Sequence, residues 1–321
     1  MKLYFGTGDK TNPYLNLSAE WEIYENCGEK EVYLFLWQNA DTVVIGANQN
    51  PYSECNRDNI ICDNVKIARR KTGGGAVFHD MGNLNFSFVA PKNVYDVKKQ
   101  LSVIGKALEH FGVKSSFSGR NDILCEGRKF SGNAFYTSKV ACLHHGTILI
   151  NADFSRMKKY LTVNKDKLAK KGVPSVESRV INLSEVAMGI TVKSIIPALK
   201  EAFENVYGGK ANPLEIDWTS EKITSRAATW AGEDYIFGKW KEFAADIRGS
   251  FDWGCAEIGI RKNGGTIETI KIASDGLYPD KIAGIEKLLS GKSCEEITNM
   301  KSDDDVENDI INLLGSKICT M

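Results

Sequence analysis

The chain has 321 residues, enough for a full hydrophobic core and for two domains. Its composition is that of a globular protein, with 42% apolar and 26% charged residues. The 41 basic and 41 acidic side chains cancel, which argues against a general nucleic-acid or membrane-surface binder.

The first three quarters of the chain interleaves helices with short strands. Helical spacing of apolar residues predicts helices over residues 16–26, 101–111 and 195–206. Short apolar runs bounded by turn residues predict strands at residues 32–37, 42–45 and 84–89 and within the segment 115–150. Asn16 or Ser18 is the expected N-cap of the first helix. Because no regular βαβ rhythm is visible, we expect a mixed sheet with flanking helices.

The character of the sequence changes near residues 240–254. Beyond this point, Asn263-Gly264-Gly265 separates two strand-like segments and predicts a β-hairpin. Helices are expected over residues 282–289 and 306–314. We therefore expect a large domain over residues 1–244 and a small α+β domain over residues 245–321.

The N-terminus and the cysteines indicate the compartment. The N-terminus lacks the apolar run of a signal peptide, and the longest apolar stretch is too short to span a bilayer. None of the eight cysteines forms a CxxC pair, so no zinc ribbon or thioredoxin-type site is indicated. We expect a cytoplasmic protein with reduced, buried thiols.

The most informative stretch is residues 69–75, two arginines followed by lysine, threonine and three glycines. Successive glycines tolerate positive φ, and their N–H groups form an anion-binding concavity. Arginines supply planar forks suited to phosphate or carboxylate. We expect this stretch to hold an anionic group beside a strand that begins near Ala76. Taken alone, however, an ordinary glycine-rich turn beside a solvated basic pair is the commoner explanation.

A second basic cluster surrounds Lys129, which lies between a turn at Gly127 and the small residues Ser131, Gly132 and Ala134. Small residues let a ligand approach closely. A lysine in this position can hold a carboxylate and a phosphate at once and stabilise the charge that develops between them. An exposed hairpin lysine remains the commoner explanation when Lys129 is considered alone.

His144 and His145 follow Cys142 on one predicted strand. Adjacent strand residues point to opposite faces, so we expect structural or pocket-lining histidines rather than a shared metal. Cys142 and His144 lie on one face, which makes Cys142 a candidate thioester nucleophile, although most buried cysteines are inert. The basic segment 170–179 fits a mobile flap and a solvated loop equally well.

Seven motifs, in order along nearly the whole chain, resemble those of bacterial two-domain lipoate–protein ligases in the biotin/lipoate ligase superfamily. They are Asn16-Leu17 with Glu20, residues 40–46 with 49–51, and residues 69–83, 118–123, 127–135, 144–151 and 178–183. The resemblance implies an α+β fold. A large catalytic domain with mixed or antiparallel sheets flanked by helices would precede a small C-terminal α+β accessory domain. Ala47 departs from the pattern, because relatives often carry arginine there.

The resemblance also implies an ATP-dependent reaction in two steps, with Mg²⁺ accompanying ATP. The carboxylate of lipoate, or of octanoate, attacks the α-phosphate to give an acyl-AMP and pyrophosphate. A lysine of a lipoyl carrier domain then attacks this mixed anhydride and releases AMP. The implied carriers are the acyltransferase subunits of 2-oxoacid dehydrogenases and the glycine-cleavage H protein, and a monomer is expected.

Carried over by motif, Lys129 is the expected catalytic residue and contacts both nucleotide and lipoate. The other expected nucleotide contacts are Arg70, Gly73, Gly74, Gly75, Ala76, Val77, Phe78, Asn121 and Asp122. Asp122 is also a candidate Mg²⁺ contact, since no metal site built by the protein alone is indicated. The expected lipoate-binding residues are Lys129, Phe35, Trp37, Val44, Val77 and His145.

Three alternatives differ from a ligase in their chemistry. An octanoyl- or lipoyl-transferase of the same superfamily would use a cysteine thioester and no ATP. A biotin ligase is disfavoured because the GRGR-type loop and an N-terminal helix-turn-helix are absent. A non-catalytic lipoate- or carrier-binding protein would have no use for two anion-binding clusters. The set of Arg70, the glycine loop and Lys129 therefore favours the ligase.

Overall fold

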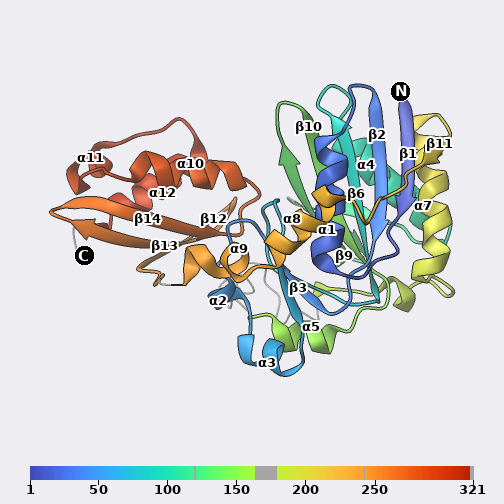
Figure 1. The fold of residues 1–321 in the computed structure, drawn as a ribbon, viewed down its shortest axis with the longest axis horizontal. Helices are drawn as coiled ribbons and strands as arrows, with labels where there is room; N and C mark the ends of the chain where they lie inside the picture. The colour runs from blue at the N-terminus through green and yellow to red at the C-terminus, as the bar shows by residue number, and fades with distance from the viewer. Residues whose placement is uncertain (119–120, 163–178, 242, 319–321) are drawn as a thin grey trace. The chain divides into compact units, whose positions relative to one another are not determined.

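The computed structural model describes residues 1–118, 121–162, 179–241 and 243–318 (Figure 1). Contacts within the chain divide it into two compact units. The first unit consists of residues 1–44, 55–68 and 77–232, and the second of residues 45–54, 69–76 and the chain from residue 233 onward. The glycine-rich stretch thus belongs to the unit that contains the C-terminal segment. The domain boundary expected between residues 244 and 245 stays a prediction.

A mixed sheet of eight strands forms the centre of the first unit, in the order β11-β1-β2-β6-β10-β9-β8-β7. Its strands are β1 (Lys2–Thr7), β2 (Glu31–Trp37), β6 (Asn83–Pro91), β7 (Ser116–Ser118), β8 (Asp122–Cys125), β9 (Arg128–Thr137), β10 (Ala141–Leu149) and β11 (Ala211–Pro213). β11, β1 and β2 pair in parallel, and all other neighbours pair antiparallel. This sheet, with helices on both faces, confirms the predicted α+β class.

Helices on opposite faces give this sheet two different environments. α4 (Val97–Glu109) and α7 (Val192–Tyr207) pack on one face, where Ile104, Leu199 and Phe88 belong to the main hydrophobic core. α1 (Pro13–Glu25) lies on the other face (Figure 1). Side chains alternate between faces along a strand. Ser87, next to Phe88 on β6, therefore points toward α1, where it bonds Glu20.

The predicted N-cap of α1 is wrong. The helix begins at Pro13, and the side chain of Asn12 accepts a hydrogen bond from the N–H of Tyr14. Proline is favoured at the first helical position because its missing N–H would have no partner there. Asn16 lies inside the helix instead and donates to the carbonyls of Lys10 and Gln38.

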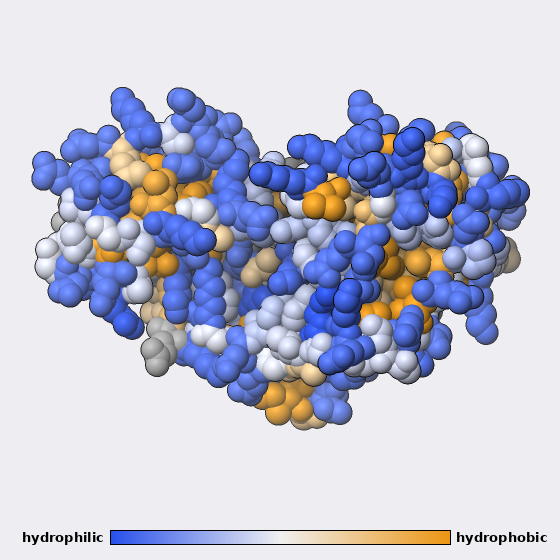
Figure 2. Space-filling view, turned by 45° about the horizontal axis from the view of Figure 1, so that its top comes forward, coloured by the Kyte–Doolittle hydropathy of each residue, from blue (hydrophilic) through white to orange (hydrophobic). Residues whose placement is uncertain are grey.

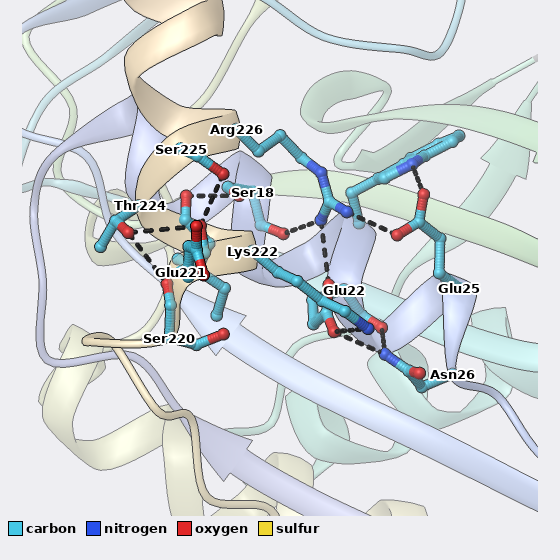
Figure 3. A network of polar contacts seen from close by, with 12 residues as sticks. Ser18, Glu22, Glu25, Asn26, Ser220, Glu221, Lys222, Thr224, Ser225 and Arg226 are labelled. Atoms are coloured by element: carbon cyan, nitrogen blue, oxygen red, sulfur yellow. Dashed lines mark hydrogen bonds and ion pairs between the residues drawn. The ribbon is translucent and has the colours of Figure 1, made fainter.

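A polar network fastens α8 (Glu221–Ala231) to α1 (Figure 3). Arg226 donates to the carbonyl of Ser18 at 3.2 Å and forms ion pairs with Glu22 at 3.2 Å and Glu25 at 2.5 Å. The hydroxyl of Ser18 donates to the carbonyl of Ile223 at 2.9 Å. α1 is therefore held from its outer side while Glu20 on its inner side reaches the sheet.

A smaller sheet has the order β4-β3-β5. Its strands are β3 (Thr42–Ile45), β4 (Lys66–Arg69) and β5 (Val77–His79). Among the described residues, the short helices of the first unit are α3 (Arg57–Cys62), α5 (Phe154–Tyr160) and the 3-10 turn η2 (Leu183–Glu185). Phe78 of β5 packs on Tyr160 of α5 with ring centroids 5.1 Å apart. The strand expected after the glycines is thus present.

The second unit contains an antiparallel sheet of β12 (Ile247–Phe251), β13 (Gly254–Asn263) and β14 (Thr266–Ser274). The predicted hairpin is confirmed, with φ of 58° at Gly264 and 83° at Gly265. The helices of this unit are α2 (Pro51–Glu54), α9 (Glu233–Phe237), η3 (Gly238–Trp240), α10 (Pro279–Leu289), α11 (Cys294–Asn299) and α12 (Asp305–Gly315). Ile258, Ile285 and Ile310 contribute to its own hydrophobic core.

The surface is mainly hydrophilic on the face shown in Figure 2, where apolar side chains form small, separate groups. The described residues include few large apolar side chains that are exposed, among them Ile61, Met81, Phe117, Val140 and Met188. In the described parts of the chain, no helix combines the length and apolar character that crossing a membrane requires.

Candidate functional site

The glycine loop of the second unit is shaped by close backbone packing. Gly74 has a φ of 91°, and its N–H donates to the carbonyl of Gly276 at 3.1 Å. A Cβ on Gly73 would lie 2.2 Å from the oxygen of Gly276, and a Cβ on Gly46 would lie 2.3 Å from the oxygen of Gly74. A Cβ on Gly75 would meet nothing within 4 Å. Gly46 and Gly73 are therefore required by contact with neighbouring backbone, whereas Gly75 borders open space.

Both arginines of this loop are buried, and both bind main-chain carbonyls. The Nη1 of Arg69 donates to the carbonyls of Gly46, Ala47 and Gln49 at 2.8–3.0 Å. Its Nε and Nη2 donate to the carbonyls of Tyr235 and Ile236. These bonds tie the segment after β3 and the C-terminal end of α9 to one guanidinium. Arg69 therefore serves as a scaffold of the second unit.

Arg70 folds back over its own loop. Its Nε donates to the hydroxyl of Thr72 at 3.0 Å, and its Nη2 donates to the carbonyls of Gly73 at 2.7 Å and Gly75 at 2.8 Å. Arg70 thus shapes the loop and places its guanidinium beside the glycine N–H groups.

Lys129 belongs to the hairpin of β8 and β9 in the first unit. The predicted turn is confirmed by positive φ at Glu126 (50°) and Gly127 (73°). The Nζ of Lys129 lies 2.7 Å from Oδ1 of Asp122, and both side chains are partly buried. A Cβ on Gly132 would lie 2.7 Å from this Nζ. The missing side chain of Gly132 therefore makes room for the ammonium group over the sheet.

Strand register puts Phe35, Trp37, His145 and the Lys129 hairpin on one face of the large sheet. Trp37 pairs with Asn85, which pairs with Thr147. The hydroxyl of Thr147 accepts a hydrogen bond from the N–H of Gly132, and Gly132 pairs with Asp122. Residues directly opposite one another in a sheet share a face. This row therefore leads from Trp37 to the ammonium of Lys129.

The neighbouring row contains Phe35, Ser87 and His145 in register. The hydroxyl of Ser87 donates to Oε1 of Glu20 at 2.5 Å, and the Nδ1 of His145 lies 2.7 Å from the same oxygen. The indole N–H of Trp37 donates to Ser87 at 2.8 Å. A buried carboxylate needs such partners, because burial without them is costly. A polar network from α1 thus fixes Trp37 and His145 on this face.

Val44 and Val77 are cross-strand partners in the small sheet, and Phe78 pairs with Val43. The ring of Phe78 is buried against Tyr160, as described above. A nucleotide contact from Phe78 would therefore use its main chain. His79, which follows on β5, lies edge-on to Trp37 with centroids 6.3 Å apart, so the two sheets of the first unit meet at Trp37.

His144 faces the opposite side of the sheet from His145, as predicted. Its Nδ1 lies 2.9 Å from Oε1 of Gln100 on α4, and its Nε2 lies 2.8 Å from Oδ1 of Asn133. Complete burial lowers the pKa of His144 from 6.5 to about 3, so this imidazole is neutral. The side chain of Asn133 donates to the carbonyl of Asn121 at 3.0 Å, which connects His144 to the start of β8.

Cys142 lacks the features of an activated nucleophile. Its side chain is buried, and desolvation raises the pKa of its thiol, which disfavours the reactive thiolate. Both ring nitrogens of His144, the expected base, lie within hydrogen-bond distance of the side-chain amides of Gln100 and Asn133. The thioester alternative thus has no support from the geometry. Among the described residues, no cluster of histidine, cysteine or carboxylate side chains suited to a metal is present.

The structure gathers the predicted site residues into two groups, one in each unit. The first unit contains Phe35, Trp37, Val44, Val77, Phe78, Asn121, Asp122, Lys129 and His145. The second contains Arg70, Gly73, Gly74, Gly75 and Ala76. Residues 170–178 of the basic connector lie outside the described residues, and Arg179 is described.

The sequence analysis assigned no site role to three polar residues that bind members of the first group, namely Glu20, Ser87 and Arg179. A glutamate amid apolar positions of α1 was the available signal for Glu20. For Ser87, no local signal distinguishes it from other small strand residues. Arg179 lies 57 residues from its partner Asp122, so only the folded chain reveals their pairing.

Comparisons with known proteins agree with this geometry. The family described as "Lipoyl protein ligase A/B catalytic domain" matches residues 12–204, and "Bacterial lipoate protein ligase C-terminus" matches residues 241–315. Lipoate-protein ligase A of Bdellovibrio bacteriovorus is 40% identical over 303 residues, which cover 91% of this chain and 88% of that protein.

Solved structures show the same likeness. The structure of P. falciparum LipL1 in complex with lipoate has a TM-score of 0.83 and 30% identity, covering 99% of this chain and 100% of that chain. A crystal structure of lipoate-protein ligase A bound with ATP has a TM-score of 0.63 and 24% identity, covering 74% of this chain and 98% of that chain, and shares the fold. On the motifs, the fold and these matches, the chain belongs to the lipoate–protein ligase family.

Proposed function

We propose that this protein is an ATP-dependent lipoate–protein ligase that forms its amide product in two steps. In the first step, a carboxylate oxygen of lipoate bonds to the α-phosphorus of ATP, and the bond from that phosphorus to the pyrophosphate leaving group breaks. In the second, the amine of a carrier lysine bonds to the acyl carbon of lipoyl-AMP, loses a proton, and AMP leaves. Octanoate would react in the same way, because the chemistry involves only the carboxylate.

The observation that carries this proposal is the ammonium of Lys129 held over Gly132, on the same sheet face as Phe35, Trp37 and His145. A carboxylate at the end of an apolar chain needs apolar walls and one fixed cation. A positioned cation also stabilises the charge that develops on the oxygens in the transition state. Lys129 is therefore our proposed catalytic residue, with Phe35, Trp37, Val44, Val77 and His145 lining the lipoate site.

The nucleotide is assigned to the remaining predicted residues. The guanidinium of Arg70 binds the carbonyls of Gly73 and Gly75, and the glycine loop has open space at Gly75. Both properties suit a polyphosphate. The proposed nucleotide contacts are Arg70, Gly73, Gly74, Gly75, Ala76, the main chain of Val77 and Phe78, Asn121, Asp122 and Lys129.

Mg²⁺ would reach the site with the phosphates of ATP. The described residues supply no metal-binding cluster of their own, and each oxygen of Asp122 contacts a cationic nitrogen. Asp122 fits a metal only after it releases one of these cations, so Asp122 is a secondary Mg²⁺ contact in this proposal. The ion would neutralise phosphate charge and orient the leaving pyrophosphate.

The protein partners in this proposal are lipoyl carrier domains. We infer that these are the acyltransferase subunits of 2-oxoacid dehydrogenases and the glycine-cleavage H protein, acting in the cytoplasm on a monomeric ligase. The scattered exposed apolar side chains support a monomer, because stable protein interfaces usually bury contiguous apolar patches.

Two measurements test the function. Isotope exchange between pyrophosphate and ATP should depend on lipoate, and intact mass of a lipoyl carrier domain should increase by one lipoyl group when enzyme, ATP and lipoate are present. Exchange should survive Cys142→Ser, whereas a thioester transferase would show acyl transfer without ATP. Lipoate binding without exchange and without added mass would show a non-catalytic binder.

A further inference from the structure

Asp122 lies between two cations. One oxygen contacts Lys129 Nζ at 2.7 Å, and the other contacts Arg179 Nη2 at 2.6 Å. The exposed fractions of the three side chains are 15% for Asp122, 21% for Lys129 and 29% for Arg179. Partial burial strengthens such ion pairs relative to pairs in bulk water. The three side chains, here called the Asp122 cluster, therefore act as one electrostatic group.

Main-chain bonds place Arg179 at this position. The N–H of Ile181 donates to the carbonyl of Lys129 at 3.0 Å, and Val180 forms a parallel bridge with Lys129. The segment of Arg179 thus runs beside the strand that carries Lys129. Lys129 pairs with Leu124 of β8 and also bridges Val180. These main-chain bonds hold Arg179 where its side chain reaches Asp122.

The charge balance of the Asp122 cluster depends on Arg179. Arg179 adds one positive charge to the ion pair of Lys129 and Asp122. Without Arg179, the Asp122 cluster would carry one positive charge less. Anions that enter beside Lys129 would then meet a less positive group.

We propose that Arg179 is a positioning residue for adenylate formation. By binding the second oxygen of Asp122, Arg179 lets an incoming carboxylate or phosphate replace Asp122 as the partner of Lys129. Asp122 then remains paired with Arg179, so no carboxylate is left without a counter-ion. This inference rests on the proposed function and adds to it a residue that acts through Asp122.

The test is lipoate-dependent exchange between pyrophosphate and ATP, measured with the full chain. For Arg179→Ala we expect kcat/KM to fall about 10-fold to 100-fold, because one positive charge is lost near the developing anion. Arg128→Ala is the matched control. Arg128 lies on the same hairpin and pairs with Glu185 at 3.7 Å and Glu126 at 3.9 Å, so its loss should change kcat/KM little.

Rescue separates an electrostatic role from a structural one. The double variant Arg179→Ala with Asp122→Asn removes one charge of each sign, so its loss of exchange should be smaller than the summed losses of the two single variants. Arg179→Lys keeps the charge and should retain most of the activity. Additive losses in the double variant would overturn the inference, as would equal effects of Arg179→Ala and Arg128→Ala.

The outcomes also distinguish this inference from the proposed function. If the wild-type protein shows no lipoate-dependent exchange, the proposed function fails. If the wild type exchanges and the Arg179 variants match it, the inference alone fails. Thermal unfolding of each variant identifies a folding defect, and Arg179→Lys remains informative if Arg179→Ala does not fold.

Discussion

Two groups of cationic side chains in this molecule are held in different ways. Arg69 and Arg70 bind main-chain carbonyls and are almost completely buried. Lys129 is partly buried and pairs with the carboxylate of Asp122. A main-chain carbonyl cannot turn away without moving the backbone, whereas a side-chain carboxylate can rotate and give way to another anion. We infer from the comparison that the arginines mainly shape the glycine loop, whereas Lys129 exchanges one anionic partner for another.

Lys129→Ala should have the largest effect. It tests the proposal that Lys129 exchanges Asp122 for an anionic ligand. Loss of the cation should lower kcat/KM for pyrophosphate exchange by about 10²-fold to 10³-fold, as for removal of other preorganised charge-stabilising groups. The thermal unfolding midpoint should stay close to that of the wild type, because no scaffold is removed. A stable variant with wild-type exchange would contradict our assignment of Lys129.

Arg69→Met should show the opposite pattern. Five main-chain carbonyls contact the guanidinium of Arg69, and methionine can donate to none of them. We expect a loss of about 3 kcal/mol in stability, since buried acceptors would lose their partners. Chemical denaturation monitored by tryptophan fluorescence measures this loss. An unfolding curve like that of the wild type would contradict the structural role that we assign to Arg69.

His144→Gln tests the scaffold behind the Lys129 hairpin. The unfolded histidine takes up a proton below its ordinary pKa of 6.5, while burial lowers the pKa in the folded protein to about 3. The stabilising contribution is present above pH 6.5 and is lost as the pH falls toward 3. Between pH 7.5 and 5, the wild type should therefore lose about 2 kcal/mol more stability than the glutamine variant.

Denaturation curves at the two pH values provide this measurement. The glutamine side chain still donates and accepts hydrogen bonds, so the variant should fold. Equal pH dependence of the two proteins would mean that His144 is not held neutral.

The matched variants Gly73→Ala and Gly75→Ala test whether the contact with Gly276 determines the shape of the glycine loop. A Cβ on Gly73 would collide with the oxygen of Gly276, but a Cβ on Gly75 would enter open space. We expect Gly73→Ala to raise KM for ATP roughly tenfold, because a displaced loop misplaces its N–H groups. Gly75→Ala should have a smaller effect. Equal KM values would show that the contact with Gly276 does not determine loop shape.

Local patterns in the sequence predicted much of the fold. The apolar run at residues 32–37, the turn before Lys129 and the hairpin at Gly264-Gly265 all have a signal within a few residues. Alternation along β10 also predicted the opposite orientations of His144 and His145. The strand β1 was not predicted, because its parallel pairing with β2 and β11 is not visible from its own short sequence.

The candidate site was harder to predict, because its contacts join distant residues. Family motifs named Lys129 and Arg70, but they do not say whether a cation binds a carboxylate or a carbonyl. Glu20 and His145 are separated by 125 residues, and nothing near either residue identifies the other. These partners depend on strand register and helix placement, which only the folded chain supplies.

The second unit is assembled from three stretches of chain, so the polypeptide crosses between the units at five points. A single cut after residue 232 would remove the stretch that contains Gly276, yet residues 69–76 would stay attached to the remaining protein. The N–H of Gly74 would then bond to water instead of the carbonyl it binds now. Loss of the C-terminal segment during evolution would therefore have required a substitute neighbour for this loop, from another protein or from a redesigned bend.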